Sequence, residues 1–492
     1  MMESDVVYSY WERIDGVVHG PDVFEAFFLS HTHSFWLDSS DCRVAQSTNW
    51  SYMGGGDGPH SVVLSYNRSD GTVLETWGGR NRRIAISNWF DYVANLPTPR
   101  LESAPPIPFS GGWVGWFGYE LGAHCGYPMV HDGPLPDGYL ICPDRYIAID
   151  HGKQQLYVVS FSTVSGDPMA MGWVSDTIQR IHGLCGQRMA WPRSYPLPSD
   201  LTVALGCPYW GYIDRIQACL NWISFGDSYQ LCLTNELVCE APVDGWVLYQ
   251  WMRLQNPAPY SAYIQWNGGR ILCSSPELFI QIDADGTITS KPIKGTTCRS
   301  VDTEEDARLK STLQDSEKNN AENVMIIDLI RNDLSRVCEV GSVRVPIPLA
   351  IESYTTVHQL VSTITGRLQV GIRPIEVVRA MFPGGSITGA PKYRSIELLS
   401  AIEGRARGIY TGSIGWMGWN QMAQLNIVIR SVVQAGDRLV MGVGGGIVSG
   451  SNPDDEFDEI KLKGKGAIDA LVGGYFGQGN TGSISLRGDR GE

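Results

Sequence analysis

Carboxylates on or beside the apolar rows of two predicted helices are the first candidates for chemistry in this sequence. In one helix Glu322 lies four residues before Ile326, which begins an apolar row at helical spacing, so the carboxylate shares the face expected to be buried. In another, Glu456, Glu459 and Lys463 are spaced by three and four and share one face. The pattern alone also allows an exposed first-turn Glu322 and a solvated ion pair. Two separated carboxylates, Glu322 and Glu459, would suit Mg²⁺, which takes one or two protein carboxylates and completes its shell with water and substrate.

A second candidate is the stretch FPGGSITGAPK, residues 382–392, with three glycines, two prolines and the hydroxyls of Ser386 and Thr388. This composition is incompatible with the interior of a helix or strand. Segments with helical apolar spacing flank it, so a tight turn between two helices is one interpretation. We predict instead a loop that brings its hydroxyls and backbone amides close to an anionic small molecule.

The elements that must position these residues divide the chain into parts of different character. Residues 1–189 carry β-branched and aromatic segments between Gly, Asp and Ser turns, which predicts a strand-rich N-terminal subdomain with a helix over about 168–184 near its end. The proline-rich stretch 190–207 is the expected linker. Helices and strands alternate over 208–475, the expected catalytic domain, and the tail 476–492 is expected to be disordered.

Composition narrows the class of function. The 492 residues are 43% apolar and 18% charged, as in a soluble globular protein, and the formal net charge of −14 argues against a nucleic-acid surface. We find no apolar stretch long enough to span a membrane and no signal peptide. The eleven cysteines are scattered, without a CxxC pair or a Cys/His cluster, which favours reduced thiols in the cytoplasm and gives no sign of zinc.

Several stretches, taken together and in order, resemble the chorismate-utilising enzymes, which include anthranilate synthase large subunits, aminodeoxychorismate synthase component I, and isochorismate and salicylate synthases. Between residues 208 and 470 they are GDSYQLCLT, SSPELF, KPIKGT, AENVMIIDLIRNDLSRV, YTTVHQLVSTI, FPGGSITGAPK, RGIYTGSIGW, NIVIR and GGGIVSGSNPDDEFDE. GGWVGWFGYEL in the N-terminal part is similar as well. The resemblance implies an α/β (α+β) fold with two large packed antiparallel sheets, helices outside them and the substrate between the sheets.

The resemblance also implies roles for individual residues, matched position by position. Glu322 and Glu459 match the carboxylates that hold Mg²⁺ on the ring carboxylate of chorismate, and Glu456 lies beside them at the metal. The residues that match substrate-binding groups are Tyr410, Arg430 and Lys463, with the backbone amides of a turn at Gly444, Gly445 and Gly446. The residues that match groups near the reacting part of the ring are His358, Ser386, Thr388 and the general acid Glu277.

Two positions distinguish the reactions within this family. Members that add water have a lysine base where this chain has Gln230, whereas members that use ammonia have glutamine, so ammonia is the expected nucleophile. Anthranilate synthases typically read PIAGT where this chain reads PIKGT, which places Lys294 at the alanine position. By resemblance to the aminodeoxychorismate synthases, Lys294 would attack C2 of the ring as the 4-hydroxyl leaves, and ammonia would then attack C4 and release the lysine. The TCR sequence after this motif and Gln424 depart from the family pattern, so anthranilate synthase component I and 2-amino-2-deoxyisochorismate synthase stay open as alternatives.

The source of ammonia implies partners. We find no amidotransferase domain in the sequence, so the resemblance implies a separate glutaminase subunit, and an aminodeoxychorismate lyase would act on the product. A different class of protein, a chorismate-binding or glutaminase-activating subunit without chemistry of its own, is the competing hypothesis. The intact set of candidate residues argues against it, since each chemical need of the reaction has a candidate.

Overall fold

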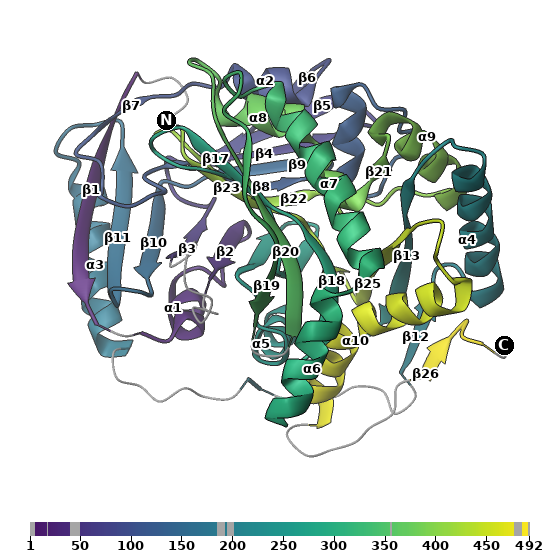
Figure 1. Cartoon of the computed structure of the whole chain (residues 1–492). Helices are drawn as coiled ribbons and strands as arrows, with labels where there is room; N and C mark the ends of the chain where they lie inside the picture. Colours follow the sequence, from purple (N-terminus) through teal and green to yellow (C-terminus); the bar gives the residue numbers. More distant parts are fainter. Residues whose placement is uncertain are drawn as a thin grey trace.

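A computed structural model describes residues 5–16, 18–39, 50–184, 192–193, 201–354, 357–476 and 485–490. Strands of the described residues form two large sheets, with helices on the outside (Figure 1). The strands are antiparallel except that β7 runs parallel to β1 and β26 runs parallel to β12. The predicted fold class is thereby confirmed.

The first sheet contains fourteen strands. In spatial order they are β26 (Ser485–Arg487), β12 (Thr202–Leu205), β13 (Gln230–Glu240), β25 (Arg438–Ile447), β24 (Ser431–Ala435), β15 (Gly269–Ser275), β14 (Tyr260–Trp266), β2 (Ser34–Asp38), β3 (Trp50–Gly55), β10 (Arg145–Asp150), β11 (Gln155–Ser162), β1 (Val6–Asp15) and β7 (Arg100–Glu102), with β21 (Gly389–Ala390) paired to β13.

The second sheet contains twelve strands. They are β18 (Ile293–Cys298), β20 (Val357–Arg367), β17 (Thr287–Lys291), β16 (Leu278–Ile282), β23 (Ala423–Asn426), β22 (Ser413–Gly418), β8 (Gly112–Phe117), β9 (Gly138–Cys142), β4 (Val62–Asn67), β5 (Thr72–Trp77) and β6 (Arg80–Ala85), with β19 (Arg344–Ser353) paired to β20.

The helices of the described residues are short to medium in length. They are α1 (Gly20–Phe27), α2 (Trp89–Ala94), α3 (Pro168–Leu184), α4 (Tyr209–Ser224), α5 (Gly245–Gln255), α6 (Thr303–Gln314), α7 (Glu317–Ser335), α8 (Pro374–Met381), α9 (Lys392–Glu403) and α10 (Pro453–Phe476), with 3-10 turns η1 (Tyr119–Cys125) and η2 (Gly385–Ile387). The helix expected over about 168–184 is α3. Over the described residues, no helix is both long and apolar enough to cross a membrane.

Three apolar cores hold these layers together. The core between the sheets joins residues such as Phe35 and Tyr146 of the first sheet to Trp116 of the second. Helices α4, α5 and α10 cover the outer face of the first sheet, where Phe457 and Ile460 are fully buried. Helices α7 and α8 cover the outer face of the second sheet. The apolar spacing of each helix therefore matches the face that it buries.

The sheets do not follow the predicted division of the chain. Both contain strands from 1–189 and from 208–475, because β2 pairs with β14 in the first sheet and β8 pairs with β22 in the second. The two parts share one core between the sheets. The boundary between them therefore stays a prediction about the sequence and does not separate two layers of the structure.

Some expectations at the ends of these parts were wrong. Residues 202–205, placed in the linker 190–207, form β12 against β13. Residues 485–487, placed in the disordered tail 476–492, form β26 against β12, because β12 leaves its outer edge open to a further strand. Most of the remaining linker and tail, 190–191, 194–200, 477–484 and 491–492, lies outside the described residues.

Candidate active site

The site lies where α7, β18, β25 and α10 meet the loop between α8 and α9 (Figure 1). That loop is the predicted stretch 382–392, and it contains η2 and the two-residue strand β21. Pairing of β21 with β13 places Ala390 opposite Gln230. The loop is thereby held against the strand that carries a second predicted site residue.

Glu277 lies directly before β16 in a fixed backbone conformation. Its N–H donates to Ser275 Oγ at 3.2 Å, and its carbonyl accepts from the N–H of Ile427 at 3.0 Å. The side chain is buried, 4% exposed, and Ser386 Oγ donates to its Oε1 at 2.5 Å. Burial raises the pKa of Glu277 to about 7, although Ser386 and the charge of Lys294 act in the opposite direction. This carboxyl group can therefore hold and release a proton near neutral pH.

Lys294 is the second residue of β18 and reaches the same loop. Its Nζ donates to the carbonyl oxygen of Ser386 at 3.1 Å. A Cβ on Gly446 would lie 3.5 Å from this Nζ and 2.4 Å from Gln230 Nε2. The absence of a side chain at Gly446 thus leaves space between an amine and an amide. The fully buried Oε1 of Gln230 finds no hydrogen-bond partner among the described residues, so it can accept a hydrogen from a ligand.

The predicted metal carboxylates gather beside this space. Glu322 is 7% exposed, which shows that its place on the apolar row of α7 is buried rather than an exposed first turn. Glu459 Oε1 pairs with Lys463 Nζ at 2.6 Å, and Lys463 Nζ also donates to the carbonyl of Gly444 at 2.8 Å. Glu456 accepts from Lys318 Nζ at 2.9 Å.

The electrostatics of the carboxylates differ. Burial raises the pKa of Glu322, with Glu456 and Glu459 reinforcing the shift and lysines opposing it. Burial also acts to raise the pKa of Glu459, but Lys463 beside it holds that pKa below its ordinary value. The carboxylate of Glu322 forms no hydrogen bond or ion pair with another described residue, since the nearby Lys318 pairs with Glu456. A largely buried carboxylate without a partner is suited to a cation.

These residues fit Mg²⁺ if the ion takes one or two of its ligands from protein carboxylates and the others from water and substrate. Within the described ranges no group of three or more His, Cys, Asp or Glu side chains is arranged to hold a metal ion. Mg²⁺ needs one or two carboxylates because it keeps waters and substrate oxygens in its shell. The unpaired carboxylate of Glu322, with Glu459 nearby, meets that requirement.

Tyr410 and Arg430 form the other end of the site. The ring of Tyr410 lies over Gly442 of β25, where a Cβ would be 2.0 Å from the ring. Burial lowers the pKa of the Arg430 guanidinium, although Tyr410 nearby acts to raise it. The Arg430 side chain forms no hydrogen bond or ion pair within the described part of the chain. A partly buried cation without an anion is suited to a ligand carboxylate.

The predicted turn at 444–446 is wrong. Gly444, Gly445 and Gly446 lie inside β25, paired with Thr234, Leu233 and Cys232 of β13. The pairing of β25 with β24 ends at Met441, so from Gly442 onwards the edge of β25 opposite β13 has no strand partner among the described residues. Backbone amides on that edge remain able to bind an anion.

Two predicted site residues use their polar atoms elsewhere. Both ring nitrogens of His358 are engaged, Nδ1 with Ser353 Oγ at 2.8 Å and Nε2 with Asp306 Oδ1 at 3.0 Å. Thr388 is fully buried and its hydroxyl donates to the carbonyls of Gly384 and Gly385, so it supports the loop from within. The roles of these two residues near the substrate ring stay predictions.

Sequence reasoning missed the cations that neutralise and brace the site. Lys318 lies four residues before Glu322 on α7, a helical spacing that signals a common face. Lys392 ends the loop and returns to its start, donating to the carbonyls of Met381 and Pro383 and pairing with Asp333 Oδ2 at 2.5 Å. Nothing in the local sequence signals this contact, because two of its three acceptors are backbone groups.

Comparison with known proteins identifies the family. The model of the chorismate binding enzyme family matches residues 36–469, and the chain belongs to that family. Aminodeoxychorismate synthase of Streptomyces pristinaespiralis is 37% identical over 488 residues, which cover 96% of this chain and 67% of that protein. Aminodeoxychorismate synthase component 1 of Salmonella typhimurium is 36% identical, over 72% of this chain and 75% of its own length.

The solved structures agree on the fold. Anthranilate synthase component I of Streptococcus pneumoniae superposes with a TM-score of 0.73 at 22% identity, covering 92% of this chain and 99% of that one. The chain spans between half and about two thirds of the length of the aminodeoxychorismate synthases that it matches from two Streptomyces species, Arabidopsis thaliana and Oryza sativa.

Proposed function

We propose that this chain is an aminodeoxychorismate synthase of the component I type, a transferase that converts chorismate and ammonia to 4-amino-4-deoxychorismate. The observation that carries the proposal is the contact of Lys294 with the loop that orients Glu277. The amine donates to the carbonyl of Ser386, and the hydroxyl of the same residue donates to Glu277. A nucleophile and a proton donor therefore meet at one residue. The names of the relatives support the same activity.

The first chemical step joins the lysine to the ring. Neutral Lys294 Nζ forms a bond to C2, the two ring double bonds shift toward C4, and the C4–O bond breaks. Glu277 gives its proton to the departing hydroxyl, which leaves as water. Because burial places the pKa of Glu277 at about 7, a useful fraction of the group is protonated at neutral pH.

The second step installs nitrogen and frees the enzyme. Ammonia forms a bond to C4, the double bonds shift back, and the C2–N bond to Lys294 breaks. The proton that the new ammonium gives up restores protonated Glu277, and Lys294 leaves as the neutral amine, so chorismate and ammonia give the amine and water. The unpartnered Oε1 of Gln230 supports this step, because it can accept a hydrogen from ammonia next to Lys294.

The binding groups lie at two ends. Glu322 and Glu459 would hold Mg²⁺, which supplies positive charge for the ring carboxylate. Arg430 and Tyr410 would bind the enolpyruvyl carboxylate, helped by the free edge of β25. Burial makes the unpaired charges of Glu322 and Arg430 costly in the free protein, so Mg²⁺ would stabilise the first and a carboxylate of chorismate the second.

Partners follow from the reaction. A separate glutamine amidotransferase would supply ammonia, with ammonium salts as a substitute in vitro, and an aminodeoxychorismate lyase would convert the product to 4-aminobenzoate for folate synthesis. The described cysteines are all free, which supports work in the reducing cytoplasm.

The test is identification of the product. Purified chain is incubated with chorismate, Mg²⁺ and ammonium, and an aminodeoxychorismate lyase is then added. We expect 4-aminobenzoate that depends on the lyase. Anthranilate and pyruvate formed without the lyase would instead assign the chain to anthranilate synthase, and absence of any turnover would favour a non-catalytic chorismate-binding subunit.

A further inference from the structure

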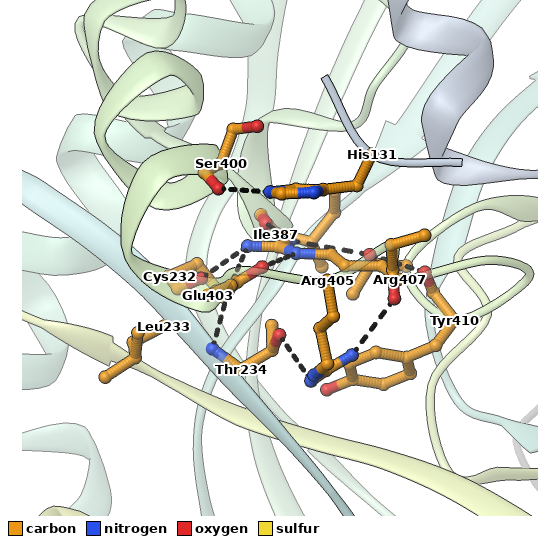
Figure 2. Close-up of polar contacts among 12 residues, drawn as sticks. His131, Cys232, Leu233, Thr234, Ile387, Ser400, Glu403, Arg405, Arg407 and Tyr410 are labelled. Atoms are coloured by element: carbon orange, nitrogen blue, oxygen red, sulfur yellow. Dashed lines mark hydrogen bonds and ion pairs between the residues drawn. The ribbon is translucent and has the colours of Figure 1, made fainter. Parts of the chain in front are cut away.

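A buried arginine lies behind the loop 382–392, outside the contacts that the proposed reaction uses. Arg407 is 6% exposed, and its guanidinium pairs with Glu403 through two hydrogen bonds of 2.8 Å, Nε to Oε2 and Nη2 to Oε1. Its ζ-carbon lies 4.3 Å from the ring centre of Tyr119. Figure 2 shows this pair enclosed by chain segments that are distant in sequence.

The remaining donors of Arg407 join two segments of the site. Nη1 donates to the carbonyl of Ile387 at 2.9 Å, and Nη2 donates to the carbonyl of Cys232 at 2.8 Å (Figure 2). Ile387 is the residue between Ser386 and Thr388 in the loop, and Cys232 lies two residues after Gln230 on β13. One guanidinium therefore bridges the loop and the strand, beside the backbone pairing of β21 with β13.

The arginine is itself held from both sides. Glu403 Oε1 also accepts from the N–H of Thr234 at 2.9 Å, which ties α9 to β13. The carboxylate of Glu120 accepts from the N–H groups of Arg407 and Gly408 at 2.7 and 2.9 Å, which ties the backbone to the N-terminal part of the chain. The guanidinium is thus fixed in place before any ligand binds.

We propose that Arg407, oriented by Glu403, is a positioning residue that holds Ser386 against Glu277 and Lys294. This role rests on the proposed amination. The carbonyl that Arg407 binds directly follows Ser386, whose hydroxyl and carbonyl both make the contacts of the reacting groups. A displacement of this residue alters acid and nucleophile together, and about 1 Å of misplacement is enough for a rate loss of about 100-fold.

The test uses Arg407→Lys, Ser386→Ala and the double variant. Lysine keeps the charge but has one nitrogen, which cannot reach Glu403, Ile387 and Cys232 at once. We expect kcat to fall about 10- to 100-fold with the KM for chorismate within about threefold, since the binding groups are untouched. In the Ser386→Ala background the same substitution should lower kcat less than it does in the wild type, because the hydroxyl contact with Glu277 is already lost and only the carbonyl contact with Lys294 can still be displaced.

The pH profile gives a second readout. Loss of the Ser386 hydrogen bond raises the pKa of Glu277, so the alkaline limb of kcat should move to higher pH in Arg407→Lys as it does in Ser386→Ala. The charged groups that act on Glu277, Lys294 of β18 and Lys463 of α10, are unchanged in both variants. If the losses of kcat in Arg407→Lys and Ser386→Ala are additive and the alkaline limb of Arg407→Lys stays at the wild-type pH, Arg407 only stabilises the fold.

Controls separate this proposal from the proposed function. His131→Phe removes another hydrogen bond to α9, from His131 Nε2 to the carbonyl of Ser400 at 2.9 Å, without touching the loop, and should keep wild-type kcat (Figure 2). If Arg407→Lys does not fold, Glu403→Gln carries the same prediction, because it keeps Arg407 and one acceptor oxygen. A wild-type chain that makes no amine overturns the proposed function, whereas an active wild type with additive variants overturns only the positioning role.

Discussion

Two clusters of charged side chains lie on either side of the loop 382–392, and they are built differently. In the cluster behind the loop, Arg407 and Glu403 are buried and satisfy each other and nearby backbone groups. In the cluster that faces the site, Glu322 has no partner among the described residues, and Glu459 has a half-exposed lysine. Arg407, Glu403 and Glu322 are buried, in a low-dielectric setting where an unpaired charge is costly.

The difference in pairing distinguishes charges that stabilise the folded structure from charges that are available to bind a ligand. A fully paired buried ion pair gives specificity to the packing around it, and removal of one partner is strongly destabilising. An unpaired buried carboxylate destabilises the free protein and gains its partner only on binding. Substitutions in the fully paired cluster should therefore lower the stability of the protein. Substitutions in the cluster that faces the site should lower activity without lowering stability.

The largest expected effect is on the nucleophile in the site. Lys294→Ala should lower the rate of 4-aminobenzoate formation by about 10³-fold or more, because the covalent route is removed. Lys291→Ala is the matched control, since Lys291 lies in the same KPIK segment but pairs with Glu352 Oε1 at 2.5 Å. It should retain wild-type rate. Incubation of the wild type with chorismate without ammonium should give an adduct at Lys294, visible by mass spectrometry as chorismate less water.

The next effect tests the unpaired carboxylate. Glu322→Gln should reduce activity about 100-fold or more and abolish its response to added Mg²⁺, because a ligand of the cation is lost. Without Mg²⁺ its free energy of unfolding should be equal to or above that of the wild type at pH 7. The sign follows from the raised pKa of Glu322, which makes the ionised form destabilising above the pKa of the unfolded chain. A clear loss of stability would mean that Glu322 has a structural partner.

The buried pairs should respond in the opposite way. Lys392→Met leaves the 4% exposed Asp333 without its cation and should cost about 3–5 kcal/mol in urea unfolding. Lys465→Met on α10 is the control, because its pair with Asp469 is exposed and should contribute less than about 1 kcal/mol. Equal costs for the two lysines would remove the distinction between buried and exposed pairs on which the comparison depends.

A feature of the site could be predicted from the sequence only where it depends on residues that are close together in the chain. Helical spacing placed Glu322 on an apolar row but left its burial open, and the loop followed from its glycines and prolines, because both signals are properties of neighbouring residues. The reactive roles came from family resemblance, since no spacing shows that Lys294 meets Ser386. The placement of Gly444 was wrong because three consecutive glycines favour a turn, whereas here they form a strand against β13.

The buried arginine shows why the rest was missed. EGRARG reads as a solvated run of charges, and a Glu and an Arg four residues apart favour an exposed pair. What buries Arg407 is the supply of carbonyl acceptors from Ile387 and Cys232, which only the assembled sheet brings there. Backbone acceptors have no residue type, so a single sequence carries no sign of them.

The smallest effect concerns the proton on Glu277, at the boundary between the clusters. Glu277 must be protonated to act as the acid, so kcat should fall as pH rises above about 7, the pKa that burial gives it. In Ser386→Ala this limb should move up by roughly half to one pH unit, because the hydroxyl stabilises the carboxylate. In Glu277→Gln the limb should disappear with most of the activity. If the limb stays at the same pH in Ser386→Ala, the loop has no influence on the pKa of Glu277. The two clusters on either side of the loop would then act independently.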